Sequence, residues 1–440
     1  MAFGLAAALA ACGREEAAPT KTSSKAPNVL LFIVDTLRAD ALGPYGNGVV
    51  ETPSIDRFAR QGTLFEWAFA PTSWTRPSIT TILTGLQPGV HTVERRGSTL
   101  PSGVPLLPEV LREHGYRTGF IATNPNTGSF FGYSRGFDDF IELYERRERG
   151  KVEKEEFTAR SDQVVERAKE WMEESSKPFF LVVFVIDPHS PYDPLPEFNR
   201  YVDASPESPE EDPSQGLYFG EVAFVDHCFG RLMEHLDARG LTGETLTILT
   251  GDHGEEFFEH GKMGHGKSLF DESLHVPMVL RWPGKIQAGR RVGSPVELAD
   301  LMTTILELAE LPAPPIQDGR SLFDESSERA PFLASLMLDG QREWSVRAYP
   351  WKLVVVGDPG DMRGRKTKLF DLSSDPGEQR DVSSEHPERF QELRGWIEKR
   401  EEIDRHRRRL ALRGSQPGEA SEEGLSEDAK KALRELGYIQ

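Results

Sequence analysis

Acidic and histidine side chains stand just past apolar runs at three separate places in the sequence. Asp35, His189 and the pair Asp252-His253 each follow a run of mostly apolar residues. Such runs predict strands that are buried on both faces of a parallel sheet. Open sheets of this kind place functional groups outside the carboxyl ends of their strands. We therefore expect these side chains to lie together in one site, the alternative being three unrelated turns stabilised by polar residues.

The residue types at these strand ends are those that bind metal ions. Asp35, Asp252 and His253 offer two carboxylates and one neutral imidazole nitrogen. This set suits one divalent metal ion, which from the ligands alone is Ca²⁺, Mg²⁺, Mn²⁺ or Zn²⁺.

Thr75 stands where a loop changes into a helical pattern. Residues 75–84 read as a helix with Pro77 in its first turn, where the missing N–H is not needed. The free N–H groups and the dipole at such an end favour an anion such as phosphate or sulfate. A divalent cation also lowers the pKa of a bound oxygen, as zinc takes that of water from about 15.7 to about 7. Thr75 is thus a candidate metal ligand and nucleophile for attack on phosphorus or sulfur, and an ordinary N-cap is the alternative role.

The sequence around Thr75 resembles the opening of the sulfatase family, in the alkaline phosphatase superfamily. The resemblance rests on residues 28–40, on 52–56 and on the Leu-Thr-Gly close at 83–85. In that family the nucleophile belongs to a Cys/Ser-x-Pro-x-Arg motif, and matching the proline puts Thr75 in the nucleophile position. Two departures stand out, because the nucleophile is threonine and Ile79 replaces the motif arginine.

The resemblance continues at the second cluster. Residues 250–256 are similar to the family's second metal motif, in the Asp-His form of the phosphonate monoester hydrolases and phosphodiesterases rather than the Asp-Asn form usual in sulfatases. Asp35 matches the first member of a usual Asp-Asp pair. Thr36 stands in the second place, so one metal ligand of the family is missing.

The resemblance also implies residues that contact the substrate. His189 matches a histidine in the family's Pro-His element, and His265 and Lys267 lie in the stretch that carries a substrate-contacting His or Lys. They would donate to the transferring group or the leaving oxygen, although Lys267 also reads as a solvated loop lysine. Where the family has Gly-Lys-x-His, this chain has an Asn-Pro-Asn run that begins at Asn124, which would bind substrate oxygens or form a turn. His91 is expected to line the cleft.

Strand and helix patterns alternate along the 440 residues. They predict an α/β fold, and the resemblance implies its alkaline-phosphatase-like form: a mixed, mostly parallel sheet between helix layers, with a small C-terminal subdomain of antiparallel strands. The predicted division is a signal peptide and tether over 1–27, a catalytic domain over 28–325, a C-terminal subdomain and helix over 326–412, and a linker and closing helix over 413–440. Helices are expected at 54–61, 75–84, 107–114 and 156–174, and strands at 29–34, 117–122, 179–186 and 245–250.

The N-terminal segment predicts export. A short apolar run over 2–11 ends at Cys12 and resembles a bacterial lipoprotein signal, with Cys12 as the lipidated residue, the alternative being a plain signal peptide. We expect a periplasmic or cell-surface protein that contacts the membrane by its lipid anchor only. The net charge of −19 argues against nucleic acid as a partner.

These features together predict a hydrolase that cleaves sulfate or phosphate-type esters through a covalent intermediate on Thr75. Sulfatases need a formylglycine made from Cys or Ser, and threonine cannot yield it, so phosphate or phosphodiester is chemically favoured. The expected partner is an anionic ester, on an envelope or extracellular glycan or on a lipid head group. Two alternatives stay open: a phosphoethanolamine or glycerol-phosphate transferase of the same superfamily, and a glycan-binding pseudoenzyme.

Overall fold

The computed structural model describes residues 26–144, 159–174, 178–202, 213–324, 329–338, 341–356, 367–412, 418–419 and 424–436. The segment around Cys12, on which the predicted lipid anchor depends, lies outside these residues. None of the helices within these ranges has the length and apolar character that crossing a membrane requires.

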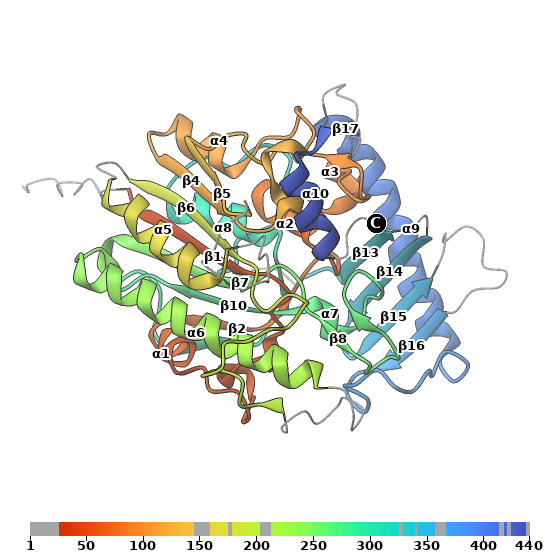
Figure 1. Cartoon of the computed structure of the whole chain (residues 1–440). Helices are drawn as coiled ribbons and strands as arrows, with labels where there is room; N and C mark the ends of the chain where they lie inside the picture. The colour runs from red at the N-terminus through yellow and green to blue at the C-terminus, as the bar shows by residue number, and fades with distance from the viewer. Residues whose placement is uncertain are drawn as a thin grey trace, which may run out of the picture.

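A sheet of nine strands forms the centre of the molecule, in the order β11-β2-β10-β7-β1-β6-β4-β5 with β12 beside β2 (Figure 1). Its strands are β1 (Asn28–Val34), β2 (Thr63–Phe69), β4 (Arg117–Ala122), β5 (Asp139–Glu142), β6 (Phe179–Val185), β7 (Thr245–Gly251), β10 (His275–Arg281), β11 (Arg290–Val292) and β12 (Val296–Glu297). β1 runs parallel to β6 and β7, and β4 runs parallel to β5 and β6, whereas β10 is antiparallel to β7 and β2. The predicted mixed, mostly parallel sheet is confirmed.

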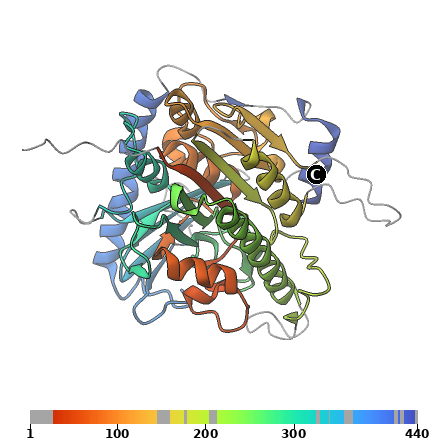
Figure 2. The ribbon, with the colours of Figure 1, turned by 90° about the vertical axis from the view of Figure 1, so that its left-hand side faces the viewer.

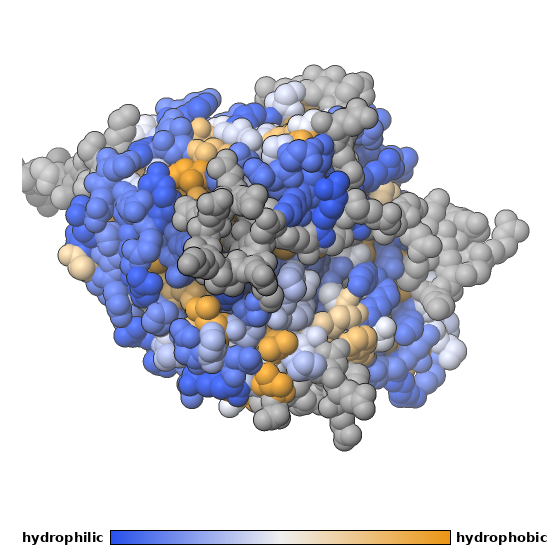
Figure 3. Space-filling view, viewed as in Figure 1, coloured by the Kyte–Doolittle hydropathy of each residue, from blue (hydrophilic) through white to orange (hydrophobic). Residues whose placement is uncertain are grey.

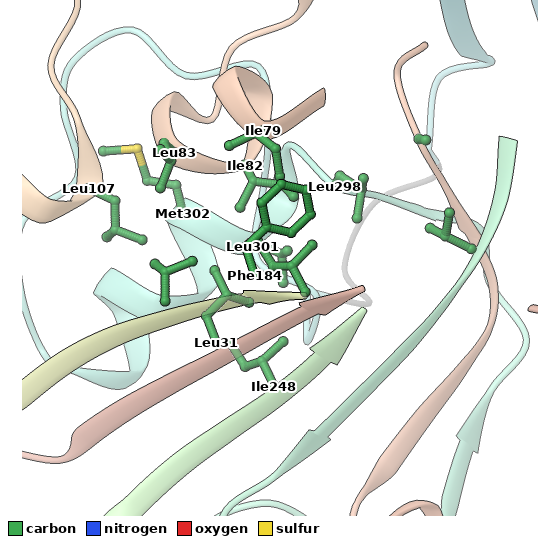
Figure 4. Close-up of a cluster of buried hydrophobic side chains, with 14 of the residues drawn as sticks. Leu31, Ile79, Ile82, Leu83, Leu107, Phe184, Ile248, Leu298, Leu301 and Met302 are labelled. Carbon is green, nitrogen blue, oxygen red and sulfur yellow. The ribbon is translucent and has the colours of Figure 1, made fainter. Parts of the chain in front are cut away.

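The central strand β1 explains why helices cover both faces of the sheet. Its residues are all buried, and successive side chains point to opposite faces. On one face, Val29, Leu31 and Ile33 pack with α2 (Thr75–Thr84), α4 (Leu107–Glu113) and α8 (Asp300–Leu308). Figure 4 shows this cluster, in which Leu31 of the sheet lies below Ile79 of α2.

The other face of β1 is covered by a second set of helices. Leu30, Phe32 and Val34 pack with α1 (Pro53–Gln61), α5 (Ser161–Glu173) and α6 (Ser214–Ala238). Figure 2, turned by 90°, shows the sheet enclosed between the helices. The outer surface is mostly hydrophilic, with apolar residues in separate groups on the face shown in Figure 3.

Short elements fill the connections between the long ones. They are α3 (Pro88–His91), α7 (Asp271–Leu274), β3 (Ser98–Thr99), β8 (Glu256–Phe257), β9 (Met263–Gly264), and the 3-10 turns η1 (Ala39–Ala41), η2 (Gly43–Tyr45), η3 (Pro125–Thr127), η4 (Ser129–Phe131) and η6 (Thr242–Glu244). β8 and β9 pair as a small ribbon beyond the end of β7. These connections carry most of the polar residues discussed below.

The C-terminal subdomain is a sheet of four antiparallel strands with one long helix. The strands β13 (Phe332–Leu338), β14 (Gln341–Ala348), β15 (Trp351–Val356) and β16 (Thr367–Asp371) are joined in sequence order. Leu393 and Ile397 of α9 (Pro387–Ala411) pack against the sheet. The predicted antiparallel subdomain is confirmed.

The end of the chain returns to the large domain. β17 (Gly418–Glu419) pairs with β3, and α10 (Glu427–Glu435) contacts η3. Ala432 and Leu433 of α10 are buried in the same cluster as α2 and α8. We expected a loose linker and a closing helix here, and the structure shows that this helix is part of the main core.

A buried ion cluster joins the C-terminal subdomain to the large domain. Asp271, at the start of α7, accepts a hydrogen bond from Lys352 Nζ on β15 at 2.6 Å and another from Arg347 on β14. Lys352 also lies 2.7 Å from Glu378, and the Lys352 and Glu378 side chains are each 1% exposed. Burial alone raises the pKa of Asp271, but the charges of Lys352 and Arg347 outweigh it and hold this pKa below the ordinary value.

We predict that Asp271→Asn lowers the free energy of unfolding by about 3 kcal/mol at pH 7, because removing one partner leaves a buried charge uncompensated. The pKa of Asp271 is lower in the folded chain, so its contribution is present above about pH 4, the ordinary aspartate value, and is lost in acid. The difference between the two proteins should therefore narrow as the pH falls below about 4 in denaturant titrations.

Glu385→Gln provides the matched control for this prediction. Glu385 pairs with Arg380 in the same subdomain, but these side chains are 49% and 67% exposed. An exposed pair contributes about 0.2 to 1 kcal/mol. Equal losses for the two substitutions would contradict the role given to the buried cluster.

Candidate metal and nucleophile site

Asp35, Asp252 and His253 meet at the carboxyl ends of two adjacent strands. β1 and β7 are paired so that Val34 is opposite Gly251, which places the residues that follow them side by side. The three side chains have no exposed surface, and their ligand atoms all lie within 4.8 Å of one another. His253 Nε2 is 3.6 Å from Asp35 Oδ1 and 3.5 Å from Asp252 Oδ2.

Each of the three side chains keeps one ligand atom available. Asp35 Oδ2 accepts a hydrogen bond from Asn124, and Asp252 Oδ1 accepts the N–H groups of Thr36 and His253. Asp35 Oδ1 and Asp252 Oδ2 are buried without a hydrogen-bond partner among the described residues. His253 Nδ1 lies 2.9 Å from the Gly254 carbonyl, which can only accept, so Nδ1 carries the proton and the Nε2 lone pair faces the carboxylates. Two unpartnered buried oxygens and one imidazole lone pair fit a divalent cation.

The electrostatics of the metal-free cluster agree with this assignment. Burial raises the pKa of Asp252 to about 8. Burial and the neighbouring Asp252 raise the pKa of Asp35 well above its ordinary value. A bound cation would reverse both effects, because it stabilises the ionised carboxylates.

Thr75 lies beside these ligands at the first turn of α2. Its side chain is fully buried, and Oγ1 is 3.3 Å from His253 Nε2. Ser78, one turn further along α2, donates to the Asp252 carbonyl at 2.5 Å and ties the helix to the loop after β7. The helix N-terminus, a hydroxyl and the metal-ligand set thus share one small volume.

His189 and His265 lie next to this cluster. The His265 ring centroid is 4.7 Å from that of His189 and 4.7 Å from that of His253. Burial lowers the pKa of His189 to about 3, and burial, His253 and nearby cations lower that of His265 well below its ordinary value. Both rings are therefore neutral near pH 7 in the metal-free chain. A bound anion would favour their protonation.

Glu255 belongs to the site and was not singled out from the sequence. Its carboxylate has no exposed surface, accepts a hydrogen bond from Tyr192 at 3.0 Å and lies 2.9 Å from His265 Nδ1. The only signal for it in the sequence is its position two residues after His253. Lys267 is exposed at the edge of the site, where its charge acts on Glu255 and His265.

The structure places His91 and Asn124 differently from what we expected. His91, the last residue of α3, is fully buried; its Nε2 lies 3.1 Å from Thr81 of α2, and its Nδ1 accepts the N–H of Val93. Both of its ring nitrogens are engaged inside the protein, so it does not line the cleft. Asn124 is also fully buried, caps η3 and donates to Asp35, which is the role that the turn interpretation predicts.

Two families of known proteins match long stretches of this chain. Residues 27–311 match the sulfatase family, and residues 259–403 match the family described as N-sulphoglucosamine sulphohydrolase, C-terminal. The first match covers more than half of the chain, which therefore belongs to the sulfatase family. The chain is a sulfatase-family hydrolase.

One relative and two solved structures illustrate the range of the family. The ulvan-active sulfatase of Formosa agariphila is 28% identical over 338 residues, which cover 69% of this chain and 65%, just under two thirds, of that protein. The phosphonate monoester hydrolase of Agrobacterium radiobacter superposes with a TM-score of 0.73 at 23% identity, over 87% of this chain and 96% of that one. A protein solved with its substrate D-glucosamine-2-N,6-O-disulfate gives 0.72 at 18% identity, over 89% and 99%. The two structures confirm the predicted alkaline-phosphatase-like fold.

We predict that a divalent ion binds the metal-free chain and raises its melting temperature, and that Asp252→Asn removes most of this increase. At a hundredfold excess of metal over Kd, binding stabilises a folded protein by about 2.7 kcal/mol. Thermal melts after chelation, with and without each of Ca²⁺, Mg²⁺, Mn²⁺ and Zn²⁺, measure the effect.

The control for this prediction is another buried aspartate. Asp226 on α6 accepts the N–H groups of Ser54 and Ile55 and lies away from the metal ligands. Asp226→Asn should lower stability but keep the increase caused by metal. A metal-induced increase that survives Asp252→Asn would show that the ion binds elsewhere.

Proposed function

We propose that this protein is a metal-dependent hydrolase that cleaves sulfate or phosphate-type esters with Thr75 as the nucleophile. The observation that carries the proposal is the position of Thr75 Oγ1, 3.3 Å from His253 Nε2 at the N-terminus of α2. A hydroxyl at that point can attack the phosphorus or sulfur of an anionic ester held by the helix end. The bond to the substrate's alcohol oxygen then breaks, the alcohol leaves, and an ester remains on Thr75 that water cleaves.

The residues of the site have separate roles in the proposed reaction. Asp35, Asp252 and His253 would hold the metal ion. When bound, such an ion lowers the pKa of a neighbouring hydroxyl and offsets negative charge on the substrate. His189 and His265 face the same volume and would donate to the transferring group or to the leaving oxygen. Glu255 orients His265 through Nδ1.

The nucleophile favours phosphate-type esters over sulfate esters. Sulfatases use an aldehyde hydrate made from Cys or Ser, and Thr75 cannot form it. An ordinary alkoxide suits phosphoryl transfer, in which positioning and charge stabilisation supply most of the catalysis. The likeness to a phosphonate monoester hydrolase supports this choice, whereas the relative's activity on ulvan supports a sulfated glycan. We propose an anionic ester on a glycan or lipid head group outside the cytoplasm as the substrate, with the protein anchored through Cys12.

We predict that Thr75→Ala lowers turnover of the preferred ester by at least about 10³-fold, because it removes the attacking oxygen. Thr75→Ser keeps a hydroxyl at the same atom and should retain activity within about tenfold. The measurement is hydrolysis of nitrophenyl sulfate, phosphate, phosphate diester and phosphonate, with each divalent ion, by the chain that begins after Cys12.

The outcomes of this panel separate the candidate functions. Activity that survives in Thr75→Ala would contradict the nucleophile. Metal binding without turnover of any ester would favour a transferase of the same superfamily. A chain that neither binds metal nor cleaves an ester would be a glycan-binding pseudoenzyme.

A further prediction concerns the missing ligand of the family's Asp-Asp pair. Thr36 is buried, its hydroxyl has no hydrogen-bond partner among the described residues, and its φ is +55°. Aspartate tolerates this left-handed conformation better than threonine does. We expect Thr36→Asp to bind Mn²⁺ at least about tenfold more tightly, because it adds a carboxylate beside the ligands.

Thr36→Asn isolates the charge in this experiment. It has nearly the shape of aspartate and the same tolerance of positive φ, but it carries no charge. Calorimetric titration with Mn²⁺ should show tighter binding for Thr36→Asp alone. Equal affinities for the two variants would place the side chain of residue 36 outside the metal site.

A further inference from the structure

The two oxygens of Asp35 have different surroundings. Oδ1 faces His253 Nε2 at 3.6 Å, whereas Oδ2 accepts a hydrogen bond from Asn124 Nδ2 at 2.7 Å. A carboxylate that is free to rotate can offer either oxygen or both to a cation. Because Asn124 binds Oδ2 of Asp35, Oδ1 is the oxygen that remains to bind a metal ion.

Asn124 is itself held in one orientation. Its Oδ1 accepts the N–H of Asn126 at 2.9 Å, and its side chain has no exposed surface. If the amide were reversed, a carbonyl oxygen would face the Asp35 carboxylate and an NH₂ group would face an N–H. The network therefore assigns the amide nitrogen to Asp35.

Arg76 holds Asn126 from the opposite side. Its guanidinium donates from Nε to the Asn126 carbonyl at 3.2 Å and from Nη2 to Asn126 Oδ1 at 2.8 Å. The guanidinium carbon lies 3.5 Å from the ring centroid of Phe131, and the residue is 2% exposed. A planar fork with two parallel donors fixes both the backbone and the side chain of Asn126.

This chain of contacts begins in the helical turn that carries the nucleophile. Arg76 directly follows Thr75 in α2, and the contacts run from it through Asn126 and Asn124 to Asp35. α10 contacts η3, which contains Asn126. The loop thus lies between the first turn of α2 and the last helix of the chain.

We propose that Arg76, Asn126 and Asn124 are positioning residues that preset Asp35 for the metal ion and keep it in register with Thr75. None of them would touch the ion, since each acts through the next residue in the chain of contacts. The inference rests on the proposed metal site. It assigns a role to Asn124 and Asn126, which stand where the resemblance predicts the family's Gly-Lys-x-His element.

Asn124→Ser tests the proposal on the full chain. Serine keeps a side-chain oxygen for the turn N–H, but its hydroxyl cannot also reach Asp35. We expect the Kd for Mn²⁺ alone, from calorimetric titration, to rise by about 10- to 100-fold, as for other residues that orient metal ligands. The circular dichroism spectrum should stay unchanged. Binding of Mn²⁺ with unaltered affinity would overturn the proposal, because a residue that only forms a turn predicts that result.

Two further variants keep the test decisive. Asn126→Ala should weaken Mn²⁺ binding in the same direction, so the test does not depend on one substitution. Asn47→Ala is the matched control, because Asn47 accepts the N–H groups of Val49 and Val50 in a similar turn without contact to the site. Its Kd should equal that of the wild type, and an equal loss in Asn47→Ala and Asn124→Ser would overturn the proposal.

The experiment also separates this inference from the function on which it rests. A wild-type chain that fails to bind Mn²⁺ or any other divalent ion would contradict the metal site itself. A wild-type chain that binds Mn²⁺, beside an Asn124→Ser chain that binds it equally well, would contradict only the positioning role.

Discussion

Two fully buried carboxylates that face one imidazole are the constraint on which the rest of this site depends. Asp35 and Asp252 each have one oxygen without a hydrogen-bond partner among the described residues, and both lie within 3.6 Å of His253 Nε2. Ionised groups without compensation are costly to bury, so this arrangement is stable only with shared protons or with a cation between them. The fold brings the ligands together through the parallel register of β1 and β7, and a metal ion would supply the missing positive charge.

The backbone next to these carboxylates is strained at Thr36. Thr36 has a φ of +55°, which costs a β-branched residue on the order of 1 to 3 kcal/mol. In this conformation the Thr36 N–H donates a hydrogen bond to Asp252 Oδ1 at 3.2 Å. Tyr218 on α6 stabilises the turn, because its hydroxyl donates to the Thr36 carbonyl and accepts the N–H of Arg38. The helix layer that covers the sheet therefore also holds the loop that orients a candidate metal ligand.

The sequence predicted the side chains that come directly after the ends of strands. It did not predict contacts between segments that are distant in the sequence. Apolar runs located β1 and β7 to within one residue at their ends, so the position of the candidate metal ligands was foreseeable. The role of His91 was not, because its partners Thr81 and Val93 are set by the packing of α2 against α3. The same holds for α10, a polar helix by composition whose buried side chains meet the main core only in the folded chain. Pairings between distant segments leave no periodic pattern that a single sequence can reveal.

The resemblance to the family's nucleophile motif places Ile79 where that motif has arginine, which bears on how the site binds a charged group. Ile79 is fully buried and points into the apolar cluster beneath α2, toward the sheet (Figure 4). No guanidinium can therefore come from that position, and the nearby Arg76 is turned toward Asn126. In the proposed reaction, the N-terminus of α2, the metal ion, His189, His265 and the exposed Lys267 would meet the charge of the ester instead. The imidazoles would become cations only once an anion is present, because burial keeps their pKa values low in the free chain. Such a site concentrates its positive charge in the complex, where it opposes the charge that develops on the transferring group.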